Sequence, residues 1–266
     1  MSAAPLRTLD LVVEGAVARA TFTRPEQLNS ISEAFLDDLD AVVASVRATP
    51  SVRALVLRGT GEVFSVGLDL ALLDRAFADL DYFQHVLTRL AGTCLSLEEL
   101  EVPVVAAVNG LARAGGFELV LACDLVLAAE GARIGDVHTS FGVVPGGGSS
   151  VRLPRLVGPQ RAKEIFFSAR WMTGTEAAEL GLALRAVPAD RLDAAVDELL
   201  AGVVDKSRQC LGTVKRQMRR SSALPTREGV AVEREEFLAY LRAPDSDGLE
   251  GFRAYRQQRR PWWAPA

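Results

Sequence analysis

Histidine and cysteine are scarce in this chain of 266 residues, which contains two of the first and three of the second. Cys94, Cys123 and Cys210 are odd in number, far apart and outside any Cys-x-x-Cys pair, so both a disulfide framework and a zinc–thiolate site are disfavoured. Two histidines are also too few for a multi-histidine metal centre. We therefore expect no metal site, and a reducing, cytoplasmic location fits best.

Long hydrophobic runs and an excess of basic residues are missing as well. The first ten residues, MSAAPLRTLD, contain no apolar signal core, and no apolar run approaches the roughly 20 residues that span a bilayer. Thirty Lys and Arg against 34 Asp and Glu give a net charge of −4, which argues against a general nucleic-acid binder. We expect no membrane or nucleic-acid partner, and the 49% of hydrophobic residues suits a folded domain.

Short apolar runs rich in β-branched residues predict strands in the first two-thirds of the chain. They cover residues 16–23, 53–59, 103–110, 124–130 and 184–188. Between them, apolar residues recur every three or four positions through 31–48 and 82–100, which predicts helices. Ser30 followed by Glu33 matches a capping box at the start of the first helix. This alternation of buried strands and helices indicates an α/β architecture.

The last quarter of the sequence contains no further strand pattern. Four helices are expected there, over residues 190–204, 207–221, 226–241 and 246–259. Glycine, proline or polar residues separate them. We therefore predict a strand-rich core over 1–195 and a helical C-terminal region over 196–266.

Three glycine-bearing loops next to predicted strands hold most of the candidate chemistry. They are residues 58–70, 108–125 and 134–148. Glycine lets a backbone approach a ligand closely, and amide N–H groups at a helix start can stabilise an oxygen that becomes negative during a reaction. Any one of these loops alone is explained as a tight turn. The dinucleotide and phosphate-loop signatures are absent, and Ser65 is a weak nucleophile candidate because its motif lacks the first glycine of a serine-hydrolase elbow.

Five separated motifs, taken in order, resemble those of the enoyl-CoA hydratase/isomerase (crotonase) superfamily. They are RPEQLNSISEAF at 24–35, FSVGLDL at 64–70, AAVNGLARAGGFEL at 106–119, PGGG at 145–148 and EGFRAYRQQRRPWW at 250–263. The motifs extend over almost the whole chain, which is specific for the superfamily but not for one reaction, because this fold hosts many chemistries. The resemblance implies a spiral of repeated β-β-α units, a C-terminal helical trimerisation region, and a homotrimer or homohexamer.

The resemblance also implies roles for particular residues. The backbone N–H groups of Leu68 and Gly115 would bind the carbonyl oxygen of an acyl-CoA thioester, an oxyanion hole that stabilises the enolate. Glu118 would be the catalytic acid or base, whereas in isolation it would fit an exposed first-turn acid favoured by the helix dipole. The implied substrate is an acyl-CoA thioester, in which coenzyme A is part of the substrate and no separate cofactor is needed.

The chain departs from the family pattern at His138, which occupies the position of the second glutamate of hydratases. A histidine can orient water or transfer a proton, with an unperturbed pKa of about 6.5. Asp136, two residues earlier, could orient His138, replace the absent acid or cap a helix. His85, in the predicted helix 82–100, either lines the acyl pocket or faces solvent.

Coenzyme A binding is implied along two of the motifs and in the tail. The residues concerned are Arg24, Leu28, Ser65, Val66, Asp69, Tyr255, Arg259 and Arg260. The forked guanidinium of arginine suits phosphate recognition, and the tail could act across a subunit boundary. A solvated basic helix explains the tail residues equally well.

Hydration of a trans-2-enoyl-CoA is the reaction that we expect first. Double-bond isomerisation is a close alternative, because one glutamate can move a proton between two carbons. Hydrolysis of a carbon–carbon or thioester bond, with water activated by His138, is a second alternative. A non-catalytic acyl-CoA-binding subunit is the third.

Overall fold

The predicted apolar runs form strands of one six-stranded sheet in the computed structural model, which describes residues 5–263. Along the sheet the strands are β1 (Leu9–Glu14), β2 (Val17–Phe22), β3 (Ala54–Gly59), β5 (Val104–Val108), β7 (Leu125–Ala129) and β10 (Arg185–Val187). Neighbours are parallel except β1 and β2, which pair antiparallel as a hairpin. All five predicted strands are confirmed, and β1 is an additional, largely exposed edge strand.

A second sheet of four short strands lies beside the first. Its order is β4 (Val63–Ser65), β6 (Leu111–Arg113), β8 (Arg133–Gly135) and β9 (Met172–Thr173). The first three run parallel, and β9 is antiparallel to β8. Strands of two or three residues are too short to show an alternating pattern, so the sequence did not predict this sheet.

Each turn of the chain adds one strand to each sheet and then a helix. The three successive units are β3-β4-α2, β5-β6-α4 and β7-β8-α5, where α2 is Leu70–Ala78, α4 is Gly115–Leu121 and α5 is Ser149–Val157. A short 3-10 helix, η2 (His138–Phe141), precedes α5. This order confirms the expected spiral of β-β-α units.

Helices cover both faces of the large sheet, which explains its continuous apolar strands. On β3, Leu55 and Leu57 face the main core with α1 (Glu33–Ala48), while Ala54 and Val56 face α8 (Leu192–Ala201). Three phenylalanines join the two sheets: Phe22 packs edge-to-face with Phe35 and Phe64, at centroid distances of 4.9 and 5.1 Å. Such pairs contribute about 0.5–1.5 kcal/mol each beyond burial.

The capping box predicted at Ser30 and Glu33 is wrong by two residues. The N-cap of α1 is Ser32, whose Oγ accepts a hydrogen bond from the Phe35 N–H at 3.2 Å. Ile31 forms a β-bridge with Leu68, so the helix cannot begin before Ser32. Ser30 donates its hydroxyl to Asp69 instead.

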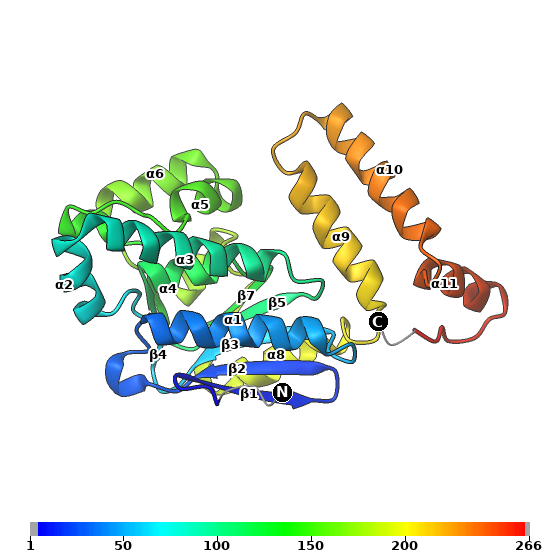
Figure 1. Cartoon of the computed structure of the whole chain (residues 1–266), viewed down its shortest axis with the longest axis horizontal. Helices are drawn as coiled ribbons and strands as arrows, with labels where there is room; N and C mark the ends of the chain where they lie inside the picture. Colours follow the sequence, from blue (N-terminus) through cyan, green and yellow to red (C-terminus); the bar gives the residue numbers. More distant parts are fainter. Residues whose placement is uncertain (1–4, 264–266) are drawn as a thin grey trace.

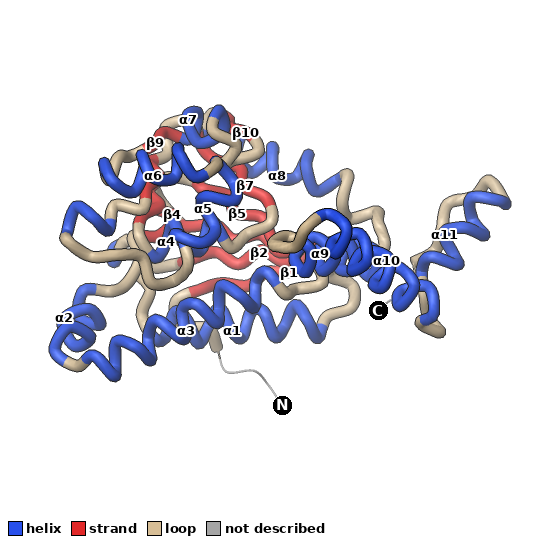
Figure 2. The backbone as a smooth tube through the Cα atoms, turned by 90° about the horizontal axis from the view of Figure 1, so that it is seen from above, coloured by secondary structure: helices blue, strands red, loops and turns tan. Residues whose placement is uncertain are grey.

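The C-terminal helices form an arm that extends from one side of the body (Figures 1 and 2). It consists of α9 (Arg208–Ser221), α10 (Thr226–Arg242) and α11 (Asp247–Arg256), as the periodicity predicted. The predicted domain division at residue 195 falls inside α8, which packs on the large sheet; the division itself stays a prediction.

The remaining helices lie on the body of the molecule or in its connections. They are η1 (Pro25–Gln27), α3 (Leu80–Glu98), α6 (Pro159–Ser168), α7 (Gly174–Glu179) and η3 (Ala189–Arg191). None of the described helices is both long and apolar enough to cross a bilayer.

Candidate active site

Three loops meet at one edge of the small sheet because the strands that precede them are parallel neighbours. Ser65 of β4 pairs with Ala112 of β6, and Arg113 of β6 pairs with Gly135 of β8. The chain leaves these three strands at the same edge, through the loops that begin at residues 66, 114 and 136. Residues that are far apart in sequence are therefore brought together there.

The amide nitrogens of Leu68 and Gly115 lie close together in this cluster of loops. A Cβ built on Gly115 would be 3.5 Å from the Leu68 nitrogen and 3.2 Å from the Gly67 Cα. Ile31 holds the first loop, since its N–H donates to the Gly67 carbonyl at 2.8 Å and its carbonyl accepts from the Asp69 N–H at 3.0 Å. Neither the Leu68 nor the Gly115 N–H has an acceptor within residues 5–263. Two free donors at one point can stabilise a developing oxyanion.

The backbone before Gly115 is strained. Ala114 has φ 48° and ψ −121°, a conformation that favours glycine, and such a residue costs on the order of 1–3 kcal/mol. Close packing on either side of Ala114 enforces this conformation. The Ala114 N–H donates to the Gly135 carbonyl at 3.2 Å, and a Cβ on Gly116 would lie 2.1 Å from the main-chain carbonyl oxygen of Ser65. The surroundings therefore fix the direction of the Gly115 amide.

Glu118 lies in the first turn of α4 and is buried, with 1% of its surface exposed. Its Oε1 accepts hydrogen bonds from the N–H groups of Gly147 at 2.7 Å and Ser149 at 3.3 Å. Burial raises the pKa of this carboxyl, although the positive charge of His138 and the two amide donors oppose the rise. A Cβ on Gly147 would lie 2.4 Å from Glu118 Oε2, so any other residue there would displace the carboxylate.

His138 is held by Asp136. Its Nδ1 lies 2.8 Å from Asp136 Oδ1, and the Asp136 carboxylate is buried. Burial lowers the pKa of the imidazole, but the hydrogen bond to Asp136 and the charges of Asp136 and Glu118 outweigh this, so the pKa lies above 6.5. The hydrogen bond to Asp136 thus orients His138, which is one of the roles that the sequence left open for Asp136.

Ser149 is a site residue that the sequence analysis missed. It is fully buried at the start of α5, where its main-chain N–H binds Glu118 and its hydroxyl donates to Asp136 Oδ2. One residue therefore links the carboxylate of Glu118 to the Asp136–His138 pair. A serine at a predicted helix start was the only available signal, and it indicates a cap before it indicates a partner far away in the sequence.

The two segments implied in coenzyme A binding lie side by side, since the Val66 N–H donates to the Leu28 carbonyl at 3.2 Å. Ser65 and Val66 are buried, and the Ser65 hydroxyl accepts from the Gly67 N–H at 3.3 Å, which also leaves Ser65 poorly placed as a nucleophile. Asp69 caps α2. Of this set, Leu28 at 46% and Arg24 at 38% of the side chain are the ones that expose substantial surface.

The tail candidates lie on the arm. Tyr255 belongs to α11, and Arg259 and Arg260 follow it, with Arg259 paired to Glu250 at 2.6 Å. Both views place α11 at the far end of the arm from α4, so the structure does not bring these residues to Glu118 within one chain (Figures 1 and 2). His85 lies exposed on α3.

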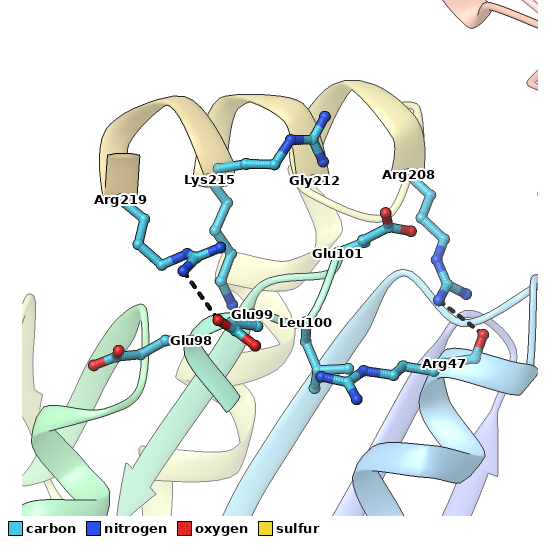
Figure 3. A pocket seen from close by; sticks show the side chains of 10 residues that line it. Arg47, Glu98, Glu99, Leu100, Glu101, Arg208, Gly212, Lys215 and Arg219 are labelled. Atoms are coloured by element: carbon cyan, nitrogen blue, oxygen red, sulfur yellow. Dashed lines mark hydrogen bonds and ion pairs between the residues drawn. The ribbon is translucent and has the colours of Figure 1, made fainter. Parts of the chain in front are cut away.

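A charged cleft of about 500 Å³ lies between α9 and the turn from α3 to β5, and it contains none of the predicted site residues (Figure 3). Arg219 pairs there with Glu99 at 3.0 Å. Arg208 is buried and donates to main-chain carbonyls at the end of α1, among them those of Val46 and Thr49. These contacts join the arm to the core. Within residues 5–263, no group of three His, Cys, Asp or Glu side chains is arranged to hold a metal ion, and the three cysteines are free.

Comparison with known proteins assigns the chain to a family. The sequence model of the enoyl-CoA hydratase/isomerase family matches residues 13–265. The chain belongs to the enoyl-CoA hydratase/isomerase family. This confirms the crotonase resemblance that the five motifs indicated.

Relatives in this family match most of the length of the chain. The human mitochondrial enoyl-CoA hydratase domain-containing protein 2 is 33% identical over 251 residues, which cover 92% of this chain and 84% of that protein. Human mitochondrial methylglutaconyl-CoA hydratase is 33% identical over 241 residues, or 88% of this chain and 69% of that protein. The crystal structure of an enoyl-CoA hydratase from Bacillus anthracis superposes with a TM-score of 0.90 at 30% identity, covering 98% of this chain and 100% of the other.

Proposed function

We propose that this family member is an enoyl-CoA hydratase that adds water to a trans-2-enoyl-CoA. The observation that carries the proposal is the convergence of Glu118 and the Asp136-bound His138 beside the two unbonded amides of Leu68 and Gly115. An acid, a base and an oxyanion site are the groups that hydration of an α,β-unsaturated thioester requires. The hydratase names of the relatives support the same reaction class.

The thioester carbonyl oxygen would accept hydrogen bonds from the Leu68 and Gly115 N–H groups. Attack at C3 moves the double-bond electrons onto this oxygen, so the donors bind the enolate more strongly than the substrate. Losing one such donor costs on the order of 3 kcal/mol of barrier stabilisation. The exposed side chains of Arg24 and Leu28 are proposed to contact the coenzyme A part of the substrate.

Glu118 would accept a proton from water as the water oxygen bonds to C3. His138 would then donate its Nε2 proton to C2, which converts the enolate into the 3-hydroxyacyl thioester. The proton held by Glu118 returns to the imidazole to close the cycle, so H and OH are added and nothing is left over. No electron carrier is involved, and we propose that no cofactor is required.

The two groups suit these roles because their charges are opposite. The carboxylate of Asp136 favours the imidazolium form of His138, and that positive charge favours the carboxylate form of Glu118. Each charge therefore favours the form that general acid–base catalysis requires of its neighbour, the carboxylate of Glu118 as base and the imidazolium of His138 as acid.

The test is to incubate the protein with crotonyl-CoA in heavy-oxygen water and to analyse the product by mass. We expect labelled 3-hydroxybutyryl-CoA, and in Glu118→Gln a loss of kcat of about 10³-fold with unchanged thermal melting. Double-bond migration in a longer enoyl-CoA without water addition would show an isomerase instead. A labelled free carboxylate would show a hydrolase, and thioester binding with no turnover would show a binding subunit.

We further propose that the protein assembles as a homotrimer or homohexamer in the cytoplasm. Support for assembly comes from the arm, which exposes large apolar side chains to solvent. They include Val214, Met218, Val230, Phe237, Phe252 and Trp262. Apolar surface of this kind is typical of a protein interface.

A further inference from the structure

Ser149 touches both halves of the proposed acid–base machinery. Its main-chain N–H donates to Glu118 Oε1 at 3.3 Å, and its hydroxyl donates to Asp136 Oδ2. The other oxygen of Asp136 lies 2.8 Å from His138 Nδ1. A continuous chain of hydrogen bonds therefore runs from the Ser149 hydroxyl through a buried carboxylate to the imidazole.

The Ser149 hydroxyl is not used by the helix that it begins. A serine near a helix start ordinarily accepts a hydrogen bond from the first-turn amides of the same helix. The N-cap of α5 is Gly148, which has φ 113° and no side chain to cap the helix. The Ser149 hydroxyl instead points away from α5 to a carboxylate 13 residues earlier. Local helix stability therefore does not explain this serine.

A carboxylate that is hydrogen-bonded at one oxygen resists rotation about its Cβ–Cγ bond less than one that is hydrogen-bonded at both. The Ser149 hydroxyl binds Oδ2 and the His138 main-chain N–H contacts Oδ1 at 3.4 Å, so both oxygens of Asp136 are fixed. With Oδ1 fixed, the Nδ1 of His138 keeps its proton toward Asp136, and Nε2 is left for the substrate. Within residues 5–263, Nε2 has no hydrogen-bond partner.

We propose that Ser149 is a positioning residue that locks Asp136 and thereby fixes the tautomer of His138. The role rests on the proposed function in that His138 is the acid of the hydration step. The effect of Ser149 on the tautomer of His138 can be measured without turnover.

The charged and polar groups of this part of the site come from three elements. Asp136 lies at the end of β8, Glu118 lies on α4, and α5 supplies Ser149 together with Arg152. The Arg152 guanidinium donates to the Gly147 carbonyl at 2.8 Å and acts on Glu118 rather than on His138. From α6, Phe166 contributes only a main-chain carbonyl, which binds Thr139. Removal of the Ser149 hydroxyl therefore takes away one uncharged donor to Asp136 and leaves every charge in place.

The first test measures the tautomer of neutral His138 by NMR of isotope-labelled histidine above its titration midpoint. The chain has two histidines, so His85→Gln assigns the signals. We expect the Nδ1–H form in the native protein and a mixture with the Nε2–H form in Ser149→Ala and in Ser149→Gly. Ser150→Ala is the matched control, because Ser150 is the next residue of α5 and is exposed. An unchanged tautomer in both Ser149 variants would overturn the proposal.

The second test is a double-mutant cycle on turnover. Ser149→Ala should lower kcat about tenfold with KM within twofold, since the hydroxyl contacts a charged group but no substrate. In an Asp136→Ala background the same change should have no further effect, because the link it acts through is gone. Equal losses in both backgrounds would show that Ser149 acts independently of Asp136. If the tautomer shifts but no hydration is found in any variant, the lock stands and the proposed function fails.

Discussion

At the scale of single residues, Glu118 and His138 are two titrating groups of opposite charge in one buried site. Burial alone would neutralise both, by raising the pKa of the carboxyl and lowering that of the imidazole. Asp136 reverses the direction for His138, and the resulting positive charge limits the rise for Glu118. Each of the two charges therefore favours the charged form of the other.

This pairing predicts a bell-shaped pH dependence of kcat/KM. Activity should fall at acid pH as Glu118 is protonated, with a midpoint above the ordinary 4.5, because its pKa is raised. It should fall again at alkaline pH as His138 loses its proton, with a midpoint above 6.5. Steady-state kinetics on crotonyl-CoA across pH would measure both limbs. In His138→Gln we expect the alkaline limb to disappear, and its persistence would rule out His138 as the acid.

The close packing around Gly115 predicts that a single added methyl group, in Gly115→Ala, lowers activity. In Gly115→Ala the added Cβ would lie 3.2 Å from the Gly67 Cα, so the two loops must separate and the amide donors move apart. We expect kcat to fall by about 10²-fold or more, since one donor is effectively lost. Gly131→Ala is the control, because a Cβ there meets nothing within 4 Å. Equal activity of the two variants would contradict the proposed oxyanion site.

At the scale of elements, Arg208 connects the arm to the body. Its guanidinium donates to main-chain carbonyls near the end of α1, including those of Arg47 and Val52, and thus interacts with the negative end of the helix dipole. Because the residue is 4% exposed, the charge is largely removed from water. Main-chain carbonyls compensate for that loss in place of an ion pair.

Replacement of this arginine should cost stability. Arg208→Met leaves several carbonyl groups without donors, and we expect the free energy of unfolding to fall by about 1.5–3 kcal/mol. Arg219→Met, on the same helix, removes a half-exposed ion pair with Glu99 and should cost less than about 1 kcal/mol. Chemical denaturation of both variants would measure the difference. A larger loss in Arg219→Met would show that the buried contacts of Arg208 are not the stronger link.

The sequence predicted elements well wherever the signal was local. The run at 103–110 is buried on both faces as β5, and the periodicity of 31–48 became α1, because burial and helical spacing are visible in a single segment. The strands of the small sheet were missed, since their pairing is decided by neighbours far along the chain. The helix start moved to Ser32 for the same reason: the bridge between Ile31 and Leu68 is a tertiary contact.

For the site, the motifs predicted which positions converge, and local spacing could not predict what holds them. Glu118 and Gly115 lie in one motif, so their proximity was readable from the sequence. The contacts of Ser149 with Glu118 and Asp136 span 31 and 13 residues, and nothing in the segment 145–150 indicates either partner. Positioning contacts of this kind become visible only when the loops are assembled.

At the scale of the whole molecule, the exposed apolar side chains of the arm predict association. Phe252 on α11 is 61% exposed, and Phe252→Asp should reduce the mass measured by light scattering from three or six chains toward one, because a charge would be buried in the contact. Val12→Asp is the control on β1, at 50% exposure and away from the arm. A native protein that runs as one chain at all concentrations would contradict the expected assembly.

The two proposed carbonyl-binding donors belong to the main chain, and this has an evolutionary consequence. On the proposed mechanism, polarisation of the thioester would not depend on which side chains the loops carry, so a change at position 138 would alter proton transfer without abolishing enolate stabilisation. A lineage can thus exchange one acid for another there while it retains a partly competent catalyst at each step.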